Sequence, residues 1–168
     1  MSLTEPQRAL VLDWTRKLHT LEYAHRYASV SRERQNLFLG VPAVVLSGVI
    51  GAQVSTPWQA DPRVQSGIAI AATLVAVLVG LQTFFKPTEI AEKHRSASAT
   101  YEDFRHRLEL LLVFESTASA DLAKKLEQLK AEWDRLETPN VSKGAWKSAK
   151  ARVAEVGTYP ERLQLPAA

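Results

Sequence analysis

Residues 36–85 have the sequence NLFLGVPAVVLSGVIGAQVSTPWQADPRVQSGIAIAATLVAVLVGLQTFF, in which the only charged side chains are Asp61 and Arg63. The uncharged runs before and after this pair each exceed the roughly 20 residues that a helix needs to cross a bilayer. The connecting segment, residues 55–63, contains two prolines, a tryptophan and both charges, a composition typical of a turn at a membrane surface. The stretch therefore predicts a hairpin of two transmembrane helices, which we place at residues 37–85.

Two other interpretations of the apolar runs fit the sequence less well. A secretory signal would lie closer to the start of the chain, whereas the first apolar run begins only at Asn36. A hairpin buried in a soluble bundle would normally show a polar stripe along each helix, and neither run has one. We therefore expect the hairpin to lie in a membrane.

The basic residues that flank the hairpin predict its orientation, because cytoplasmic flanks carry an excess of Lys and Arg. Three cations precede the first run and three follow the second, against Arg63 alone in the turn. The six flanking cations are Arg26, Arg32, Arg34, Lys86, Lys93 and Arg95. Both termini are therefore expected in the cytoplasm.

Residues 1–36 predict a cytosolic amphipathic helix that starts near Thr4 and runs into the first span, with a kink or restart at Pro42. Charged residues, Glu22 among them, are expected off its apolar face. That face consists of Leu10, Trp14, Leu18, Leu21, Ala24 and Ala28.

Residues 86–157 predict further cytosolic helices, because two groups of mainly apolar residues alternate at spacings of three and four, as in a heptad seam. The first seam is His94, Ala97, Tyr101, Phe104, Leu108 and Leu111, and the second is Leu122, Leu126, Leu129, Trp133 and Leu136. Residues 116–119 separate the two seams. Ser142 can cap a short last helix, and residues 158–168 are expected to form an irregular tail. The fold class is therefore an all-α membrane protein, a two-transmembrane hairpin with long cytosolic helices forming a bundle.

The sequence offers little catalytic chemistry. It shows no nucleophile with its base, no paired carboxylates and no glycine-rich phosphate loop. The four histidines, His19, His25, His94 and His106, fit no metal-ligand spacing, and His94, on a seam, is expected to be a packed or hydrogen-bonded core histidine. We expect a protein that is not an enzyme and that takes no cofactor or metal.

Small and uncharged polar residues recur at helical spacing within both spans, where they permit close helix approach. These candidate pore-lining or helix-packing residues are Gly40, Ala43, Ser47, Gly51, Thr73, Ala76, Gly80, Gln82 and Thr83. Pore lining and simple helix packing remain equally open from the sequence. No ionisable residue lies within either span, which disfavours an ion-coupled transporter. One hairpin cannot enclose a channel, so a pore requires a closed homo-oligomer, with a tetramer expected.

Three ordered strings resemble the SLATT domain family, a two-transmembrane module named for its association with SMODS nucleotidyltransferases and SLOG sensor domains in bacterial conflict systems. They are GVPAVVLSG at 40–48, GLQTFF at 80–85, and AEKHRSA at 91–97 followed by Tyr101. The resemblance covers roughly residues 14–149.

The resemblance implies an effector that oligomerises in the bacterial inner membrane and opens a pore, so that a phage-infected cell is depolarised and is arrested or dies. It also implies control by a nucleotide or oligonucleotide signal made by a nucleotidyltransferase-type partner. The 168 residues leave no room for a sensor domain beside the hairpin and its helices, so we expect that partner to be a separate protein.

An anionic signal would need arginine-rich, partly desolvated sites. The candidate ligands are Arg32, Arg34, Lys93, Arg95, Arg105 and Arg107. The simpler interpretation is that these cations attract anionic lipid and fix the topology. Lys143, Lys147 and Lys150 beside Trp146 could likewise bind stacked bases, but a solvated or membrane-surface helix face is favoured.

Three functional hypotheses follow from the sequence. The leading one is a ligand-controlled pore, the second is a non-conducting membrane anchor that recruits a cytosolic partner through its seams, and the third is a membrane enzyme. The missing catalytic groups disfavour the enzyme. Small and polar residues along both spans favour the pore, because a uniform Leu/Val surface would suffice for an anchor.

Overall fold

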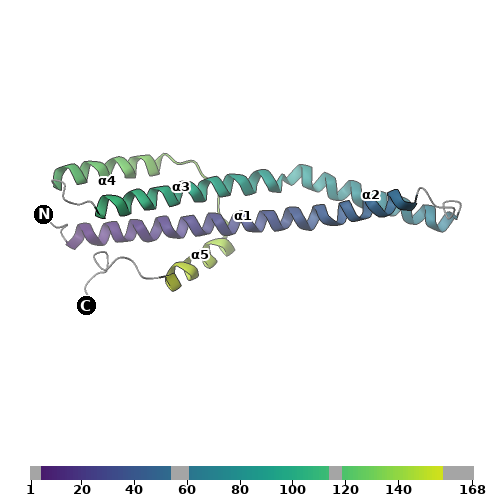
Figure 1. The fold of residues 1–168 in the computed structure, drawn as a ribbon, viewed down its shortest axis with the longest axis horizontal. Coiled ribbons are helices and arrows are strands. Elements are labelled where there is room, and N and C mark those ends of the chain that lie inside the picture. Colours follow the sequence, from purple (N-terminus) through teal and green to yellow (C-terminus); the bar gives the residue numbers. More distant parts are fainter. Residues whose placement is uncertain (1–4, 54–60, 114–118, 157–168) are drawn as a thin grey trace. The chain divides into compact units, whose positions relative to one another are not determined.

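The structure is a computed structural model that describes residues 5–53, 61–113 and 119–156. Every regular element in these ranges is an α-helix (Figure 1), which confirms the predicted all-α class. The helices are α1 (Glu5–Gln53), α2 (Pro62–Phe85), α3 (Pro87–Val113), α4 (Ser119–Asp134) and α5 (Lys143–Val156). Four parts of the sequence predictions lie outside the described residues: Thr4, the expected turn at 54–60, residues 116–118 of the expected interruption, and the expected tail at 158–168.

The chain forms two compact units. The bundle unit combines Met1–Ser29 with Glu92–Ala168, and the hairpin unit is Val30–Ala91. Helix α1 therefore contributes its first half to the bundle unit and its second half to the hairpin unit, whereas α2 belongs wholly to the hairpin unit.

Helix α3 is drawn between α4 and α1 in the bundle unit (Figure 1), and the core lies where these three helices meet. The buried core residues are Val11, Leu12, Leu18, Ala97, Tyr101, Phe104, Leu108 and Leu129. Partly buried residues packed against them are Trp14, Leu21, Leu111, Leu126, Trp133 and Leu136. His94 and Leu122 are buried as well, so both predicted seams are confirmed as inward-facing, and burial of this apolar surface is the main stabilising term.

The predicted inner face of the first helix is wrong at two positions. Leu10 is half exposed, whereas Val11 and Leu12 are buried, and Glu22 is buried although it was expected on the outer face. The buried positions at spacings of four and three are Val11, Thr15, Leu18, Glu22, His25 and Ser29. Most of these are polar, and a polar side chain is buried only where it finds a partner. Apolar periodicity therefore could not identify this face.

The predicted cap of the last helix is confirmed. The backbone N–H of Ala145 donates to the Ser142 hydroxyl oxygen at 3.2 Å, and the N–H of Trp146 donates to the Ser142 carbonyl at 3.0 Å. The first bond satisfies a donor that the first turn of a helix otherwise leaves unpaired, and the second is the first intrahelical bond of α5. Serine at this position thus defines where α5 begins.

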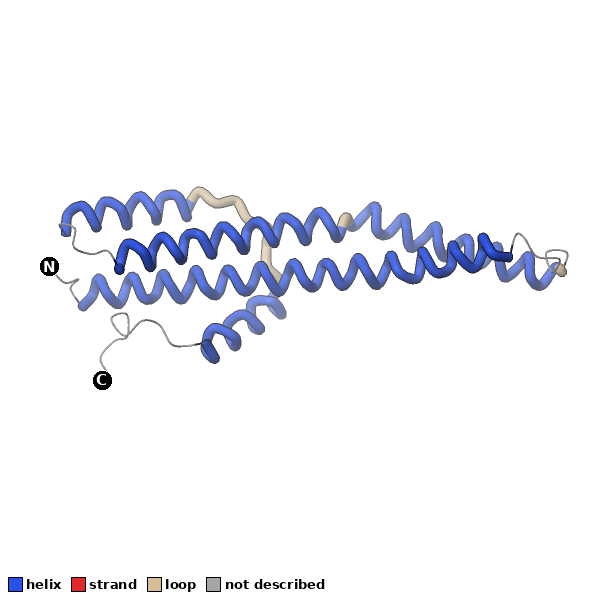
Figure 2. The backbone as a smooth tube through the Cα atoms, viewed as in Figure 1, coloured by secondary structure: helices blue, strands red, loops and turns tan. Residues whose placement is uncertain are grey.

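Local chemistry defines both ends of α2 in the hairpin unit. The Asp61 carboxylate accepts a hydrogen bond from the N–H of Arg63 at 2.8 Å, with Pro62 in the first turn. At the other end Lys86 adopts a left-handed conformation, φ 43° and ψ 51°, and its N–H donates to the Gln82 carbonyl. Figure 2 draws this residue as a short break before α3 begins at Pro87.

Helix α1 continues through Pro42 without a break, so the predicted restart at this residue is wrong, and a kink there stays a prediction. Proline is compatible with helical φ, and it removes only one backbone donor from the ladder of hydrogen bonds. A helix can therefore pass through it when the rest of the segment favours helix.

Candidate functional site

Helices α1 and α2 are each long enough and apolar enough to cross a membrane. No residue of α2 is buried, and large apolar side chains such as Phe38 and Phe84 are 78% and 81% exposed. Soluble monomers rarely expose apolar surface on this scale. The hairpin unit therefore has an apolar surface that is suited to contact lipid or another apolar surface.

A polar contact between Gln82 and Asn36 joins α1 to α2 inside the hairpin unit. The Gln82 Nε2 donates to the Asn36 carbonyl oxygen at 3.2 Å and to its side-chain oxygen at 3.0 Å. A Cβ atom on Gly40 would lie 2.8 Å from the same Nε2. Glycine at position 40 thus leaves the space that the glutamine amide occupies, and Asn36 is a member of this site that the sequence did not identify.

A groove of about 560 Å³ lies between α1 and α2 at this contact. Four of the predicted residues, Gly40, Ala43, Ser47 and Gln82, line it together with Asn36. The other lining residues are the apolar Leu37, Val41, Val44, Val45 and Val79. The structure thus brings part of the predicted set together along one face of the hairpin unit.

The remaining predicted span residues, Gly51, Thr73, Ala76, Gly80 and Thr83, are exposed within the chain. The hydroxyls of Thr73 and Thr83 donate to the carbonyls four residues earlier in their own helix, as does that of Ser47. Gly51 and Gly80 have no atom within 4 Å of where a Cβ would lie. These positions are therefore open within one chain, and their hydroxyls need no partner from another helix.

Replacing Gly40 by Ala is expected to leave the hairpin unit about 1 kcal/mol less stable than Gly51→Ala does, because both substitutions gain the same helix propensity but only the methyl at position 40 disturbs the hydrogen bonds of the Gln82 amide. Gly51→Ala is the matched control in the same helix, since its methyl meets open space. Thermal unfolding in detergent, followed by circular dichroism, compares the two. Equal melting temperatures for both variants would contradict the proposed role of Gly40.

The six candidate signal-binding cations are divided between the two units. Arg32 and Arg34 lie in the hairpin unit, and Lys93, Arg95, Arg105 and Arg107 lie in the bundle unit. Arg32 donates to the Gln35 side-chain oxygen at 2.9 Å, and Arg95 pairs with Glu92 at 3.1 Å. The structure therefore does not gather these six residues in a single unit.

Arg105 is partly buried between two carboxylates. Its guanidinium donates to Glu22 on α1 at 3.0 Å and to Glu109 on its own helix at 2.8 Å, and its side chain is 17% exposed. Burial by itself lowers the pKa of Arg105, but the hydrogen bonds to the two carboxylates outweigh it and hold the pKa above its ordinary value. Two carboxylates surround one guanidinium, so the local net charge is negative and disfavours the binding of an additional anion.

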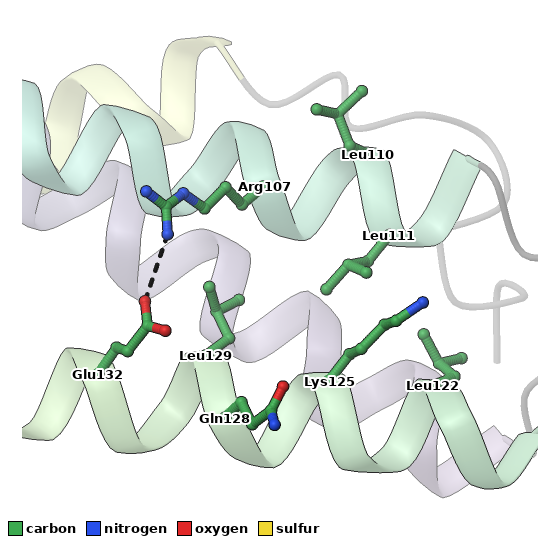
Figure 3. A pocket seen from close by; sticks show the side chains of 8 residues that line it. All are labelled: Arg107, Leu110, Leu111, Leu122, Lys125, Gln128, Leu129 and Glu132. Carbon is green, nitrogen blue, oxygen red and sulfur yellow. Dashed lines mark hydrogen bonds and ion pairs between the residues drawn. The ribbon is translucent and has the colours of Figure 1, made fainter.

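Arg107 lies at a second groove, of about 390 Å³, between α3 and α4 in the bundle unit (Figure 3). Its guanidinium reaches across to Glu132 at 3.2 Å and also pairs with Asp103 at 2.8 Å. The groove is otherwise lined by Leu110, Leu111, Leu122, Lys125, Gln128 and Leu129. It is thus mainly apolar, with cationic groups at its edge.

Two histidines that are far apart in the sequence meet in the bundle unit. The Nδ1 atoms of His25 on α1 and His94 on α3 lie 3.0 Å apart, and both side chains are buried. The Tyr101 ring packs against His25 with ring centres 5.3 Å apart. The expectation of a hydrogen-bonded core histidine at position 94 is confirmed, whereas its partner was not identified from the sequence.

Burial and, second, the neighbouring His94 lower the pKa of His25 from 6.5 to about 4. Both causes disfavour a positive charge on the ring. Within residues 5–53, 61–113 and 119–156, no group of three or more His, Asp or Glu side chains is arranged to hold a metal ion. His25 is therefore neutral at neutral pH and shares a hydrogen bond with His94.

The fold and these sites define a helical bundle unit joined to an apolar helical hairpin unit. No family model, curated protein or solved structure matches the chain. The similarity to the SLATT domain therefore rests on the three sequence strings alone.

Proposed function

We propose that this protein is a pore-forming effector of a bacterial antiphage conflict system. Several copies, most simply four, would associate through their hairpin units in the inner membrane, with both termini in the cytoplasm. A nucleotide or oligonucleotide signal from a nucleotidyltransferase-type partner would control the pore. Conduction would depolarise the membrane and cause growth arrest or death.

The observation that supports this proposal most directly is the uncovered apolar surface of the hairpin unit. No residue of α2 is buried by the rest of the chain, so α2 needs lipid or neighbouring copies around it. Gly51 and Gly80 add positions at which another helix could approach closely, because no atom of the described residues lies within 4 Å of where their Cβ would be. One hairpin encloses no path, so conduction requires several copies.

The cations are proposed to bind the anionic signal by charge-assisted hydrogen bonds. Arg95 is the best single position to test. Its side chain is 62% exposed and pairs with the equally accessible Glu92, so an incoming phosphate could compete for it at little cost. Arg105 would contribute least, because Glu22 and Glu109 already surround it.

Purified protein in liposomes is expected to conduct ions, and Gly51→Leu or Gly80→Leu should reduce the flux to the level of protein-free liposomes. Within the described part of the chain, neither leucine meets an atom within 4 Å at Cβ, so a loss of flux reports contact with another copy or a blocked path. Gly144→Leu is the control, since this glycine lies in α5 and is equally open. Flux that is unchanged in both span variants would contradict the proposed packing of copies.

A non-conducting anchor is the second candidate, and one observation favours it. The hydroxyls of Ser47, Thr73 and Thr83 are satisfied within their own helices, so they can face lipid without an unpaired donor. The flux experiment separates the two candidates when it is repeated with candidate nucleotides. Absence of flux under every condition, from an oligomer shown to be intact, would favour the anchor.

A further inference from the structure

The contact between α1 and α3 in the bundle unit is polar at successive levels. His25 and His94 share a hydrogen bond, the Ser98 hydroxyl donates to the Glu22 carbonyl at 3.0 Å, and Arg105 pairs with the Glu22 carboxylate. Helix α3 also shares the apolar core with α1 and α4, and the exposed Arg107–Glu132 pair joins it to α4. The polar contacts between α1 and α3 include buried groups, namely the two histidines and the Glu22 carboxylate.

The bond between the two Nδ1 atoms constrains the protons on both rings. One Nδ1 must carry a hydrogen and donate it, and the other must be bare and accept it. A first added proton can leave this bond in place but puts a positive charge in a buried site. A second added proton makes both Nδ1 atoms donors, which removes the bond and places two positive charges about 3 Å apart.

We propose that the α1–α3 contact is an acid-sensitive latch, in which the neutral His25–His94 pair holds the two helices together and the doubly protonated pair releases them. His25 lies four residues before the end of Met1–Ser29, and His94 lies two residues after Glu92. Both histidines therefore lie close in sequence to the limits of the bundle unit on α1 and on α3. Its use in controlling conduction rests on the proposed function.

The titration of the pair gives the direction of the effect. The pKa of His25 in the folded protein, about 4, lies below its ordinary value of 6.5. Neutral His25 therefore contributes its full stabilisation above about pH 6.5 and loses it as the pH falls through about 4.

Other ionisable groups surround the pair but belong to other contacts. They are Tyr101, whose ring packs against His25, and the chain neighbours Glu22 and Arg26 on α1 and Lys93 and Arg95 on α3. Glu22 binds Arg105, Arg95 pairs with Glu92, and the Tyr101 hydroxyl lies 3.2 Å from the Thr138 hydroxyl. The buried residues of α5 are the apolar Ala149 and Val153. Burial and His94 are thus the causes that act on His25.

Distance measurement between two spin labels tests the latch without depending on conduction. The chain has no cysteine, so Arg26→Cys and Arg95→Cys place single thiols on exposed positions beside the two histidines. In detergent we expect a narrow distance distribution at about pH 7.5 that becomes longer and broader at about pH 4. An unchanged distribution would overturn the proposal, whether or not the protein forms a pore.

The His25→Gln/His94→Gln double variant separates the pair from the carboxylates that also titrate in this range. Glutamine amides can bond to each other at either pH, so the broadening at low pH should be lost. His19→Gln is the matched control on α1, because burial also lowers the pKa of His19, and it should retain the broadening. If the double variant has the helical content of the parent and still broadens equally at low pH, the latch is overturned. Loss of the broadening in the His19 control would overturn it as well.

Discussion

Replacing Leu108 by Ala is expected to lower the free energy of unfolding by about 2–5 kcal/mol, because the side chain is completely buried in the core of the bundle unit and its removal leaves a cavity. Denaturant unfolding in detergent, followed by circular dichroism, measures the loss. Leu110→Ala is the matched control on the same helix, since Leu110 is 53% exposed; it should change stability by no more than about 0.5 kcal/mol. Similar losses for both leucines would contradict the packing of α3 described above.

Replacing Arg105 by Ala is expected to cost about 3–5 kcal/mol, because it leaves the Glu22 carboxylate buried without its counter-charge. The Glu22 side chain is 9% exposed and Arg105 is 17% exposed, so the carboxylate that remains is poorly solvated. The same unfolding measurement applies.

Arg107→Ala is the control for this ion pair. Arg107 also pairs with two carboxylates, but its side chain is 53% exposed, so its loss should cost less than about 1 kcal/mol. Raising the salt concentration should weaken the contribution of Arg107 more than that of Arg105. Equal losses from the two substitutions would show that Arg105 is not a buried partner of Glu22.

The sequence predicted the parts of the fold that depend on apolar periodicity and local capping. Tyr101, Phe104 and Leu108 are buried as the spacing indicates, since a heptad pattern describes which side of a helix faces its neighbours. Ser142 caps α5 through bonds to residues three and four positions ahead, which lie within reach of a local sequence pattern.

The polar contacts could not be predicted, because each joins residues distant in the sequence. His25 and His94 are separated by 69 positions, Glu22 and Arg105 by 83. A polar residue on a helix is assigned to the outer face unless its partner is known, and the partner is known only once the helices are packed. The buried face of α1 was therefore the least predictable part of the bundle unit.

The candidate site in the hairpin unit was predictable in composition but not in detail. Small residues indicated where helices could approach, and Gly40 does face Gln82. The contact with Asn36, 46 positions away, depends on the register of two apolar helices. Apolar sequences specify register weakly, because many offsets bury similar surfaces.

The two fixed ends of α2 have a consequence for the thickness of the proposed membrane. Asp61 caps the first turn, and the left-handed Lys86 followed by Pro87 ends the helix, so the 24 residues of α2 have a set length. At 1.5 Å per residue this length is about 36 Å, compared with roughly 30 Å for the hydrocarbon core of a typical bilayer. In a thin bilayer α2 must therefore tilt, or the lipid around it must thicken locally. In a thicker bilayer the helix can lie closer to the membrane normal.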